Sequence, residues 1–387
     1  MVSDPQVWAE VDLSAYGHNI QALKGLSSAG ARFMAVVKAN GYGHGAVEVS
    51  RVALQSGADA LGVARLEEAL ELRAAGIDAP ILIFGFTPPE RAPDLIAHDL
   101  TQTVFSHPMA EAFAARAVED SKKLQVHIKV DTGMGRLGLL TTESASDDPD
   151  NIPAARRLGD VEAIARLGGL ELEGLFTHFA TADHADKTYA ERQLQRFMEL
   201  AAGLRARGLE FPLIHTANSA ALIDMPDSHL DMVRPGIATY GLYPSTDVQR
   251  NKVELQPVLQ WKSKVIHLKQ VPAGFGVSYG ITHMTPAPTT LATVAVGYAD
   301  GLNRLLSSRG HMLVGGQRAP VVGRICMDLT LIDVGHIPDA AVGNEVVILG
   351  RQKDEEITAD EMATTLNTIN YEIVSTITGR VPRIYLT

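Results

Sequence analysis

The apolar residues of the first 245 or so positions are gathered into short runs separated by longer stretches of mixed polarity. The runs are rich in Val, Ile, Leu and Phe and are often continuously apolar, as strands buried on both faces are. Eight such strands alternating with helices predict an α/β protein with a (β/α)8 barrel. The predicted strands are Phe33–Ala39, Ala60–Ala64, Ile81–Phe86, Thr101–Phe105, Gln125–Val130, Glu171–Phe179, Leu213–Ala217 and Met232–Tyr240.

The stretches between the runs have the spacing of apolar residues that is typical of helices. Clear examples are His44–Gln55, Leu66–Ala75, Pro108–Glu119 and Tyr189–Arg207, the last of which is followed by the stop signal Gly208. The polar segment Asp147–Arg157 contains two prolines. We therefore expect it to form a surface loop before the next helix.

The pattern changes near Pro244, after which short strand-like runs follow Gly and Pro turn signals. This indicates a mainly β domain over residues 246–387, after a barrel domain over residues 1–245. The segment Thr358–Asn367 has helical spacing, and Val7–Leu13 is strand-like and is expected to pair with the second domain. The predicted strands of this domain are Gln260–Val271, Thr290–Val296, His311–Val314, Ala319–Val322, Thr330–Val334 and Glu345–Leu349.

Composition narrows the possible functions. The 387 residues suffice for a barrel of about 250 residues and a second domain. A formal net charge of -11 argues against broad attraction to nucleic acid or to an anionic membrane. Cys326 is the single cysteine, so an intrachain disulfide and a multi-cysteine metal site are excluded, and no metal is expected. The segment Met1–Pro5 lacks the pattern of a signal peptide, and no apolar run has membrane-spanning length, so the expected location is the cytoplasm.

Lys38 closes the first predicted strand and is followed by Gly41, Gly43 and Gly45. A lysine in this position is costly to bury, and most such lysines extend their amine to solvent. Burial would lower the pKa of the amine, and a neutral amine attacks aldehydes. The glycine-rich turn favours this chemical role, because glycines let a backbone pass close to a ligand.

The segment Ala35–Gly45 resembles the pyridoxal-phosphate attachment segment of the alanine racemase family. The similarity continues, at matching order and spacing, through at least seven motifs from about Trp8 to Tyr385. The resemblance implies that the cofactor is pyridoxal 5'-phosphate, that Lys38 attaches it covalently, and that Tyr42 supports its phosphate group.

Two further motifs end the fifth and sixth predicted strands. Arg136, in Lys129–Gly138, has a planar group suited to a carboxylate, although an arginine in a glycine-rich loop is more often a surface residue. The resemblance implies that Arg136 faces the cofactor phenolate and the substrate carboxylate, and that Lys129, carbamylated in many members, braces it. It also implies that His178 lies against the pyridine ring and that Asp183 belongs to the substrate access passage.

The last two barrel strands are followed by segments that suit a phosphate group, as in many barrels. Ser219 offers a hydroxyl, and Gly236 and Ile237 offer backbone N–H groups. The resemblance assigns all three to the cofactor phosphate and places Arg234 at the pyridine nitrogen. An always-charged donor keeps that nitrogen unprotonated, which weakens the electron sink and suits an enzyme that only removes and returns one proton.

The second domain contains the remaining motifs. The resemblance implies that Tyr279 is a second catalytic base, supplied across a dimer interface, and that Met327 presents its N–H to the substrate carboxylate. Arg304 and Arg324 would line the access passage. Tyr371 would contact the phosphate and, with Tyr279, narrow the pocket to about a methyl group, which favours alanine as the substrate. We therefore predict a homodimeric alanine racemase that supplies D-alanine for peptidoglycan.

Three alternatives remain at this point. One is a racemase of the same fold that acts on serine or on several amino acids. A second is a decarboxylase with the same two domains, which the arginine at position 234 disfavours, because such enzymes usually have an acidic residue there. A third is a non-enzymatic barrel that binds pyridoxal phosphate, which the second domain with Tyr279 argues against.

Overall fold

The computed structural model describes residues 5–141 and 154–387, which divide into two compact units. The barrel unit comprises Tyr16–Gly41 and Ala46–Gln256. The β unit comprises residues 5–15, Tyr42–Gly45 and Pro257–Thr387. The short segment Tyr42–Gly45, which follows Lys38, therefore packs with the β unit. The boundary expected between residues 245 and 246 stays a prediction.

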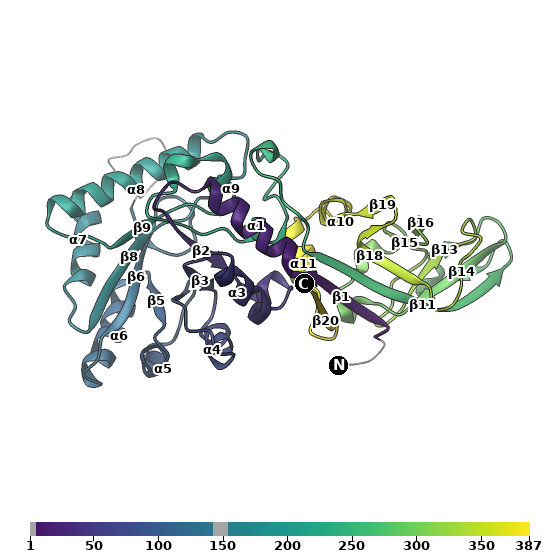
Figure 1. The fold of residues 1–387 in the computed structure, drawn as a ribbon, viewed down its shortest axis with the longest axis horizontal. Coiled ribbons are helices and arrows are strands. Elements are labelled where there is room, and N and C mark those ends of the chain that lie inside the picture. Colours follow the sequence, from purple (N-terminus) through teal and green to yellow (C-terminus); the bar gives the residue numbers. More distant parts are fainter. Residues whose placement is uncertain (1–4, 142–153) are drawn as a thin grey trace. The chain divides into compact units, whose positions relative to one another are not determined.

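The barrel unit confirms the predicted (β/α)8 fold (Figure 1). Eight strands pair in parallel in the order β10-β2-β3-β4-β5-β6-β8-β9, and the amide of Asp231 donates to the carbonyl of Ile214 at 3.1 Å to bring the first and last strands together. The short β7 (Leu139–Leu140) pairs with β6. The eight strands are β2 (Arg32–Val36), β3 (Ala60–Val63), β4 (Ile81–Ile83), β5 (Thr101–Val104), β6 (Leu124–Asp131), β8 (Leu170–Phe176), β9 (Leu213–His215) and β10 (Met232–Val233).

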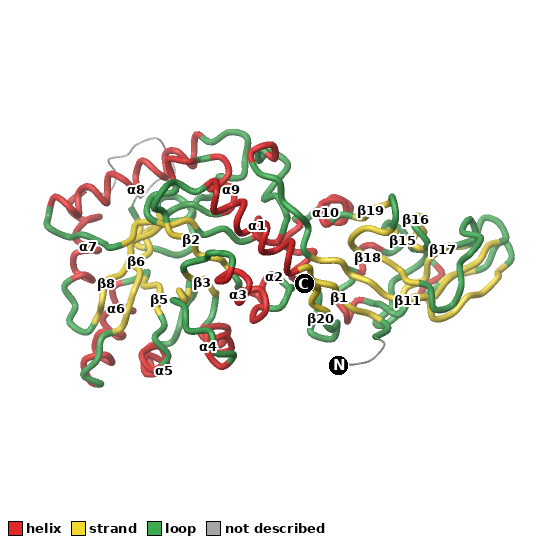
Figure 2. The backbone as a smooth tube through the Cα atoms, in the orientation of Figure 1, coloured by secondary structure: helices red, strands yellow, loops and turns green. Residues whose placement is uncertain are grey.

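Helices cover the outside of these strands (Figure 2). They are α1 (Leu13–Leu26), α3 (Ala46–Gln55), α4 (Leu66–Ala74), α5 (Ala92–Ala97), α6 (His107–Glu119), α7 (Ala154–Ala165), α8 (Thr188–Ala206) and α9 (Ser219–Asp224), with the 3-10 turns η1 (Pro89–Arg91), η2 (Pro226–Ser228), η3 (Ile237–Tyr240) and η4 (Arg250–Lys252). Inside the barrel, Met34, Ala60, Leu82 and Met232 from four strands pack into a buried cluster. Burial of such apolar surface stabilises the barrel.

Two local predictions were wrong. The predicted loop Asp147–Arg157 lies partly outside the described residues, and its last four positions begin α7, whose Val161 and Ile164 are fully buried. The first turn of this amphipathic helix is polar, and a polar segment of this kind cannot be distinguished from a loop by its composition. The predicted strand Met232–Tyr240 is a strand only at its first two residues and ends in η3, because Pro235 lacks the N–H that a strand ladder needs.

The β unit is built on a sheet of order β16-β15-β18-β11-β1-β20, to which β14, β17 and β19 are joined. In β11, alternate residues from Leu259 to Val265 are buried, as in a sheet with one face on a core. The strands are β1 (Val7–Asp12), β11 (Leu259–Val271), β12 (Gly276–Val277), β13 (His283–Met284), β14 (Thr289–Val294), β15 (His311–Val314), β16 (Gln317–Pro320), β17 (Thr330–Asp333), β18 (Glu345–Gln352), β19 (Glu355–Ile357) and β20 (Arg383–Leu386).

Strand β1 joins the beginning of the chain to this sheet, antiparallel to β11 and parallel to β20. The unit also contains α10 (Ala359–Leu366) and α11 (Asn370–Ser375), with η5 (Tyr279–Ile281), η6 (Tyr298–Asp300) and η7 (Arg304–Leu306). Helix α10 confirms the predicted helical segment, and Thr358 caps it by accepting from the Glu361 amide at 3.0 Å. In the described part of the chain, no helix is both long and apolar enough to cross a membrane.

Candidate active site

Lys38 lies two residues after β2 and opens α2 (Lys38–Tyr42), a turn with a left-handed centre. Ala39 and Asn40 each have a φ of 53°, a conformation that costs an L-residue about 1–2 kcal/mol. Two side chains fasten the turn: Glu68 accepts from the Ala39 amide at 2.6 Å, and Asn40 accepts from the Ala46 amide at 2.9 Å. A strained turn that is held in this way is typical of a functional site.

The amine of Lys38 lies in surroundings that favour its neutral form. Burial lowers the pKa of the amine, the positive charge of Arg136 lowers it further, and Glu68 partly opposes both effects. A lowered pKa leaves more of the lysine in its neutral form, and only this form acts as a nucleophile or a base near neutral pH. The sequence-based interpretation of Lys38 as a chemical group therefore agrees with its surroundings.

The glycines that follow Lys38 serve the protein's own packing. Gly43 and Gly45 have φ angles of 86° and 99°. A Cβ atom at Gly43 would lie 2.1 Å from the carbonyl oxygen of Val374, and one at Gly45 would lie 1.9 Å from the hydroxyl of Tyr385. These close approaches within the β unit explain two glycines that the sequence alone linked to a ligand.

Arg234 follows β10 and is almost fully buried, at 4 % exposure. Its guanidinium donates to Nδ1 of His215 at 2.7 Å and to the carbonyls of Thr177 at 3.0 Å and Thr216 at 3.1 Å. Burial lowers the pKa of Arg234 to about 9. A buried cation needs such acceptors, because an unpaired charge in a barrel interior is very unfavourable.

Five cationic or titratable groups gather at the carboxyl ends of the barrel strands. We call this set the cationic cluster; it consists of Lys38, Lys129, Arg136, His178 and Arg234. Burial lowers the pKa of His178 well below its usual value, and the charges of the other four members lower it further. His178 is therefore neutral at neutral pH, and the cluster as a whole suits a ligand with several negative charges.

Lys129 projects from β6 and is buried, at 5 % exposure. Burial lowers the pKa of its amine to about 8, assisted by Arg136 and Arg234 and opposed by Asp131. The loop after β6 is organised by Asp131, whose carboxylate accepts from the amides of Gly133 at 2.9 Å and Met134 at 2.8 Å and from that of Arg136 at 3.2 Å. This loop leaves the side chain of Arg136 exposed.

The two segments predicted to bind phosphate meet in the structure. Ser219 opens α9, and its hydroxyl accepts from the amides of Gly236 at 2.9 Å and Ala238 at 3.3 Å. Asn218 caps α9 by accepting from the Ala221 amide at 3.0 Å. The Ser219 hydroxyl after β9 and the amides after β10 from which it accepts are thus held together, at the carboxyl end where barrels place their ligands.

Within the β unit, the rings of Tyr42 and Tyr371 lie 6.2 Å apart between centroids. Tyr279 lies on η5 and is 70 % exposed. The preceding Ser278 has a φ of 60°, and its hydroxyl donates to the carbonyl of Arg324 at 2.6 Å, which ties the Tyr279 loop to the loop after Val322.

Met327, Arg304 and Arg324 are also exposed on the β unit. The Met327 carbonyl accepts from the Ala299 amide at 3.0 Å. Asp183 lies in the loop after β8 in the barrel unit, where its carbonyl accepts from the Ser245 hydroxyl at 2.5 Å. The structure therefore divides the predicted site residues between its two units.

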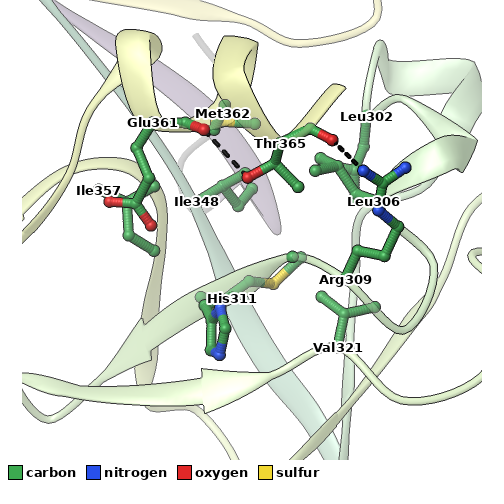
Figure 3. Close-up of a pocket in the computed structure, with 12 residues that line it drawn as sticks. Leu302, Leu306, Arg309, His311, Val321, Ile348, Ile357, Glu361, Met362 and Thr365 are labelled. Carbon is green, nitrogen blue, oxygen red and sulfur yellow. Dashed lines mark hydrogen bonds between the residues drawn. The ribbon is translucent and has the colours of Figure 1, made fainter. Parts of the chain in front are cut away.

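A small pocket in the β unit lies beside α10 and contains none of the predicted site residues (Figure 3). Arg309 and Glu361 give it a polar rim, and Met362 with Leu306 gives it an apolar wall. The guanidinium of Arg309 donates to the carbonyl of Thr365, which ties the Arg309 side chain to the end of α10. In the part of the chain that the structure describes, no group of three or more His, Cys, Asp or Glu is placed to hold a metal ion.

Sequence reasoning did not assign a role to His215 or His127, although both contribute to the surroundings of Arg234. His127 Nδ1 lies 2.8 Å from His215 Nε2, and both rings are buried. The available signal was the appearance of two histidines within predicted barrel strands, where polar side chains are uncommon.

A barrel with a half-buried lysine and a cationic cluster at its carboxyl end, joined to a β unit with an exposed tyrosine, defines a class of two-domain barrel enzymes. Residues 11–244 match the alanine racemase N-terminal domain, and residues 258–385 match the alanine racemase C-terminal domain. The chain therefore belongs to the alanine racemase family.

Individual relatives agree with this assignment. The chain is 56 % identical to an alanine racemase from Desulfosudis oleivorans, over 99 % of this chain and 97 % of that protein. An alanine racemase structure from Bacillus anthracis with bound L-Ala-P matches with a TM-score of 0.91 at 39 % identity, covering 100 % of this chain and 96 % of that one. A histidine racemase from Leuconostoc mesenteroides matches with a TM-score of 0.88 at 28 % identity, covering 100 % and 99 %.

Proposed function

We propose that this protein interconverts L-alanine and D-alanine with pyridoxal 5'-phosphate as its cofactor. The observation that carries the proposal is the cationic cluster, in which the neutral-leaning amine of Lys38 lies within the electrostatic influence of Arg136. An amine that reacts with an aldehyde and a set of cations for anionic groups are what this cofactor requires.

The donor set fits the separate parts of the cofactor. Lys38 would hold its aldehyde carbon. Ser219, Gly236 and Ile237 would hold its phosphate, together with the hydroxyls of Tyr42 and Tyr371. The charged Arg234 would donate to the ring nitrogen, and His178 would lie against the ring. When bound, pyridoxal phosphate makes the Cα proton of an attached amino acid acidic enough to be removed.

The protein's own groups would then move this proton. Racemisation needs an acid–base group on each face of Cα, and Lys38 and Tyr279 are the two groups that we assign. One removes the proton from its face and the other returns a proton to the opposite face, with the roles exchanged for the other enantiomer. Arg136 and the Met327 amide would orient the substrate carboxylate, and Asp183, Arg304 and Arg324 would line its route of access.

Lys129 is proposed to carry a carbamate. A pKa of about 8 leaves part of its amine neutral and able to add carbon dioxide near neutral pH. The resulting anion would lie near Arg136 and Arg234, whose charges would stabilise it. Protein labelled with carbon-13 bicarbonate should give a carbamate carbon signal that is absent from Lys129→Ala; the same spectrum for both proteins would exclude the modification.

The proposed assembly is a homodimer in which Tyr279 completes the site of the partner subunit. The β unit exposes several large hydrophobic side chains, each more than half exposed: Tyr279, the nearby Ile281 and Met284, and Met327. Apolar residues exposed in such numbers suggest a surface covered by another protein. Cytoplasmic location and the supply of D-alanine for peptidoglycan complete the proposal.

The choice of alanine is tested by substrate comparison. Purified holoenzyme is assayed for racemisation of L-alanine, L-serine, L-lysine, L-arginine and L-histidine by circular dichroism. We expect the largest kcat/KM for alanine. The histidine racemase among the structural matches makes histidine a necessary competitor in this test. A larger kcat/KM for any of the other four amino acids would contradict the alanine assignment.

A further inference from the structure

A cavity of about 90 Å³ lies in the barrel unit at the amino ends of the strands. Its wall includes the first residues of several strands, among them Arg32, Thr101 and Met232. The cationic cluster follows the opposite, carboxyl ends. His127 and Glu173 give part of the cavity wall a polar character. The cavity therefore marks the end of the barrel remote from the proposed chemistry.

A row of side chains runs through the barrel between these two ends. The Arg234 guanidinium lies 2.7 Å from His215 Nδ1, and His215 Nε2 lies 2.8 Å from His127 Nδ1. His127 Nε2 lies 3.9 Å from the Glu173 carboxylate, which is too far for a hydrogen bond. The Thr101 hydroxyl donates to the same Glu173 oxygen at 2.8 Å. The row joins strands β5, β6, β8, β9 and β10.

The donor and acceptor properties of these groups determine which ring nitrogen of each histidine carries the proton. An arginine can only donate, so His215 Nδ1 must accept and carry no proton. A neutral His215 then carries its proton on Nε2 and donates it to His127 Nδ1. His127 in turn carries its proton on Nε2, which faces the carboxylate of Glu173. Each link therefore determines the tautomer of the next one.

The packing holds both rings in this arrangement. The ring of Phe176 stacks on His215 with centroids 4.8 Å apart and an interplanar angle of 5°. Gly174 makes room for His127, because a Cβ atom there would lie 2.5 Å from His127 Nδ1. Burial lowers the pKa of His127 to about 3, and the charge of Arg234 lowers it further. Burial also lowers the pKa of His215 well below its usual value, so both rings are neutral, as the assigned hydrogen bonds require.

We propose that His127 is a positioning residue for Arg234. By accepting a hydrogen bond from the Nε2–H group of His215, it keeps His215 Nδ1 unprotonated and able to accept from the arginine. Glu173 ends the row. Without an acceptor at position 127, His215 loses the hydrogen bond that favours its Nε2-protonated tautomer. With the proton on Nδ1, His215 would face the guanidinium donor against donor. Arg234 would then lose one of its three hydrogen-bond acceptors.

The direct test measures tautomers by nitrogen-15 NMR of full-length protein labelled at histidine, with and without added pyridoxal phosphate. The wild-type protein is expected to show neutral His127 and His215, each protonated on Nε2, at neutral pH. The His127→Leu variant is expected to move the proton of His215 to Nδ1 or to mix the tautomers. The His127→Asn variant keeps an acceptor near the position of Nδ1 and should retain the wild-type His215 signal.

A second test compares the kinetics of racemisation between variants. It rests on the proposed function, because it requires racemase activity. We expect His127→Leu to lower kcat about tenfold with little change in KM, and His127→Asn to recover most of the loss. His229→Leu serves as the matched control, because His229 is another buried, hydrogen-bonded histidine of the barrel unit outside this row. It should leave kcat near the wild-type value.

The outcomes separate the two ideas. A His215 protonated on Nδ1, or a cationic His215, in the wild-type protein would overturn the positioning role, and this measurement needs no variant that could fail to fold. Equal values of kcat in wild type and His127→Leu would also overturn it. Absence of racemase activity in the wild-type protein would refute the proposed function, while the tautomers would still decide the structural claim.

Discussion

The two units hold their site residues in contrasting ways. In the barrel unit, Arg234 and Lys129 are 4 % and 5 % exposed, and each lies among fixed polar partners or charges. In the β unit, Tyr279 and Met327 are 70 % and 53 % exposed. Arg234 and Lys129 are fixed by the fold of their own unit, whereas Tyr279 and Met327 are presented on a surface.

Buried and exposed site residues can serve different functions. Buried cations need acceptors built in advance. Burial and neighbouring positive charges lower the pKa of Lys38, which favours its neutral amine, and hold the pKa of His178 well below its usual value. Exposed groups on a firm loop can instead complete a site that belongs to another chain. The contrast therefore agrees with the proposal that the barrel unit holds the cofactor and that Tyr279 of the β unit serves a second subunit.

The largest loss of activity is expected from a substitution in the barrel unit. Lys38→Ala should lower kcat/KM by about 10⁴-fold or more, because it removes both the cofactor attachment and one acid–base group. The visible absorption of the bound cofactor should disappear as well. The exposed lysine substitution Lys123→Ala is the control and should change neither quantity. Retention of activity by Lys38→Ala would break the assignment of the barrel unit as the site of the chemistry.

The β-unit side is tested by Tyr279→Phe, which should lower racemisation by about 10²–10⁴-fold in at least one direction. Cofactor absorbance should stay near the wild-type level, because Tyr279 is assigned to proton transfer. Tyr298→Phe, another partly exposed tyrosine of the β unit, is the matched control and should stay active. Full activity of Tyr279→Phe, measured in both directions, would refute its role as a base.

A third prediction concerns the segment after Lys38 that packs in the β unit. Gly43→Ala should lower the free energy of unfolding by about 3 kcal/mol or more, because the residue has a left-handed φ and its new Cβ would collide with the Val374 carbonyl. Gly30→Ala has the same φ of 86° but open space around it, and should cost about 1 kcal/mol. Urea denaturation measures both. Equal losses would show that packing against Val374 adds nothing.

The smallest expected effect is a pH dependence of barrel stability. The pKa of His127 is about 3 in the folded protein, against 6.5 as the ordinary value. Its neutral form thus contributes stability that is complete above pH 6.5 and is lost as the pH falls toward 3. Between pH 7 and 5, wild type should lose about 2 kcal/mol more than the non-titrating His127→Asn. Parallel pH profiles of unfolding for the two proteins would contradict a buried neutral His127.

Much of the fold followed from periodicity, because buried parallel strands and amphipathic helices have different repeats. The motif residues were identified one by one through the family resemblance, and the structure brings Lys38, Lys129, Arg136, His178 and Arg234 under one another's electrostatic influence. Their assigned roles stay predictions until the variants are measured.

Other features depend on contacts between distant residues and could not be predicted locally. The left-handed turn at Ala39 is held by a hydrogen bond that the Ala39 amide donates to Glu68, 29 residues further along the chain. The contact of His127 with His215 spans 88 residues. The glycine at position 43 was linked to a ligand, because nothing in the local sequence reveals the carbonyl of Val374 beside it.

The central claim, that Lys38 and Tyr279 of different subunits form one site, is tested most directly by mixing two inactive variants. Lys38→Ala and Tyr279→Phe are unfolded together in equal amounts, refolded with pyridoxal phosphate, and assayed for racemisation of L-alanine. A mixed dimer has one site with both groups intact, and half of the dimers are mixed. Activity should therefore recover to about one quarter of refolded wild type. Activity no higher than the sum of the separate variants would contradict a site shared between subunits.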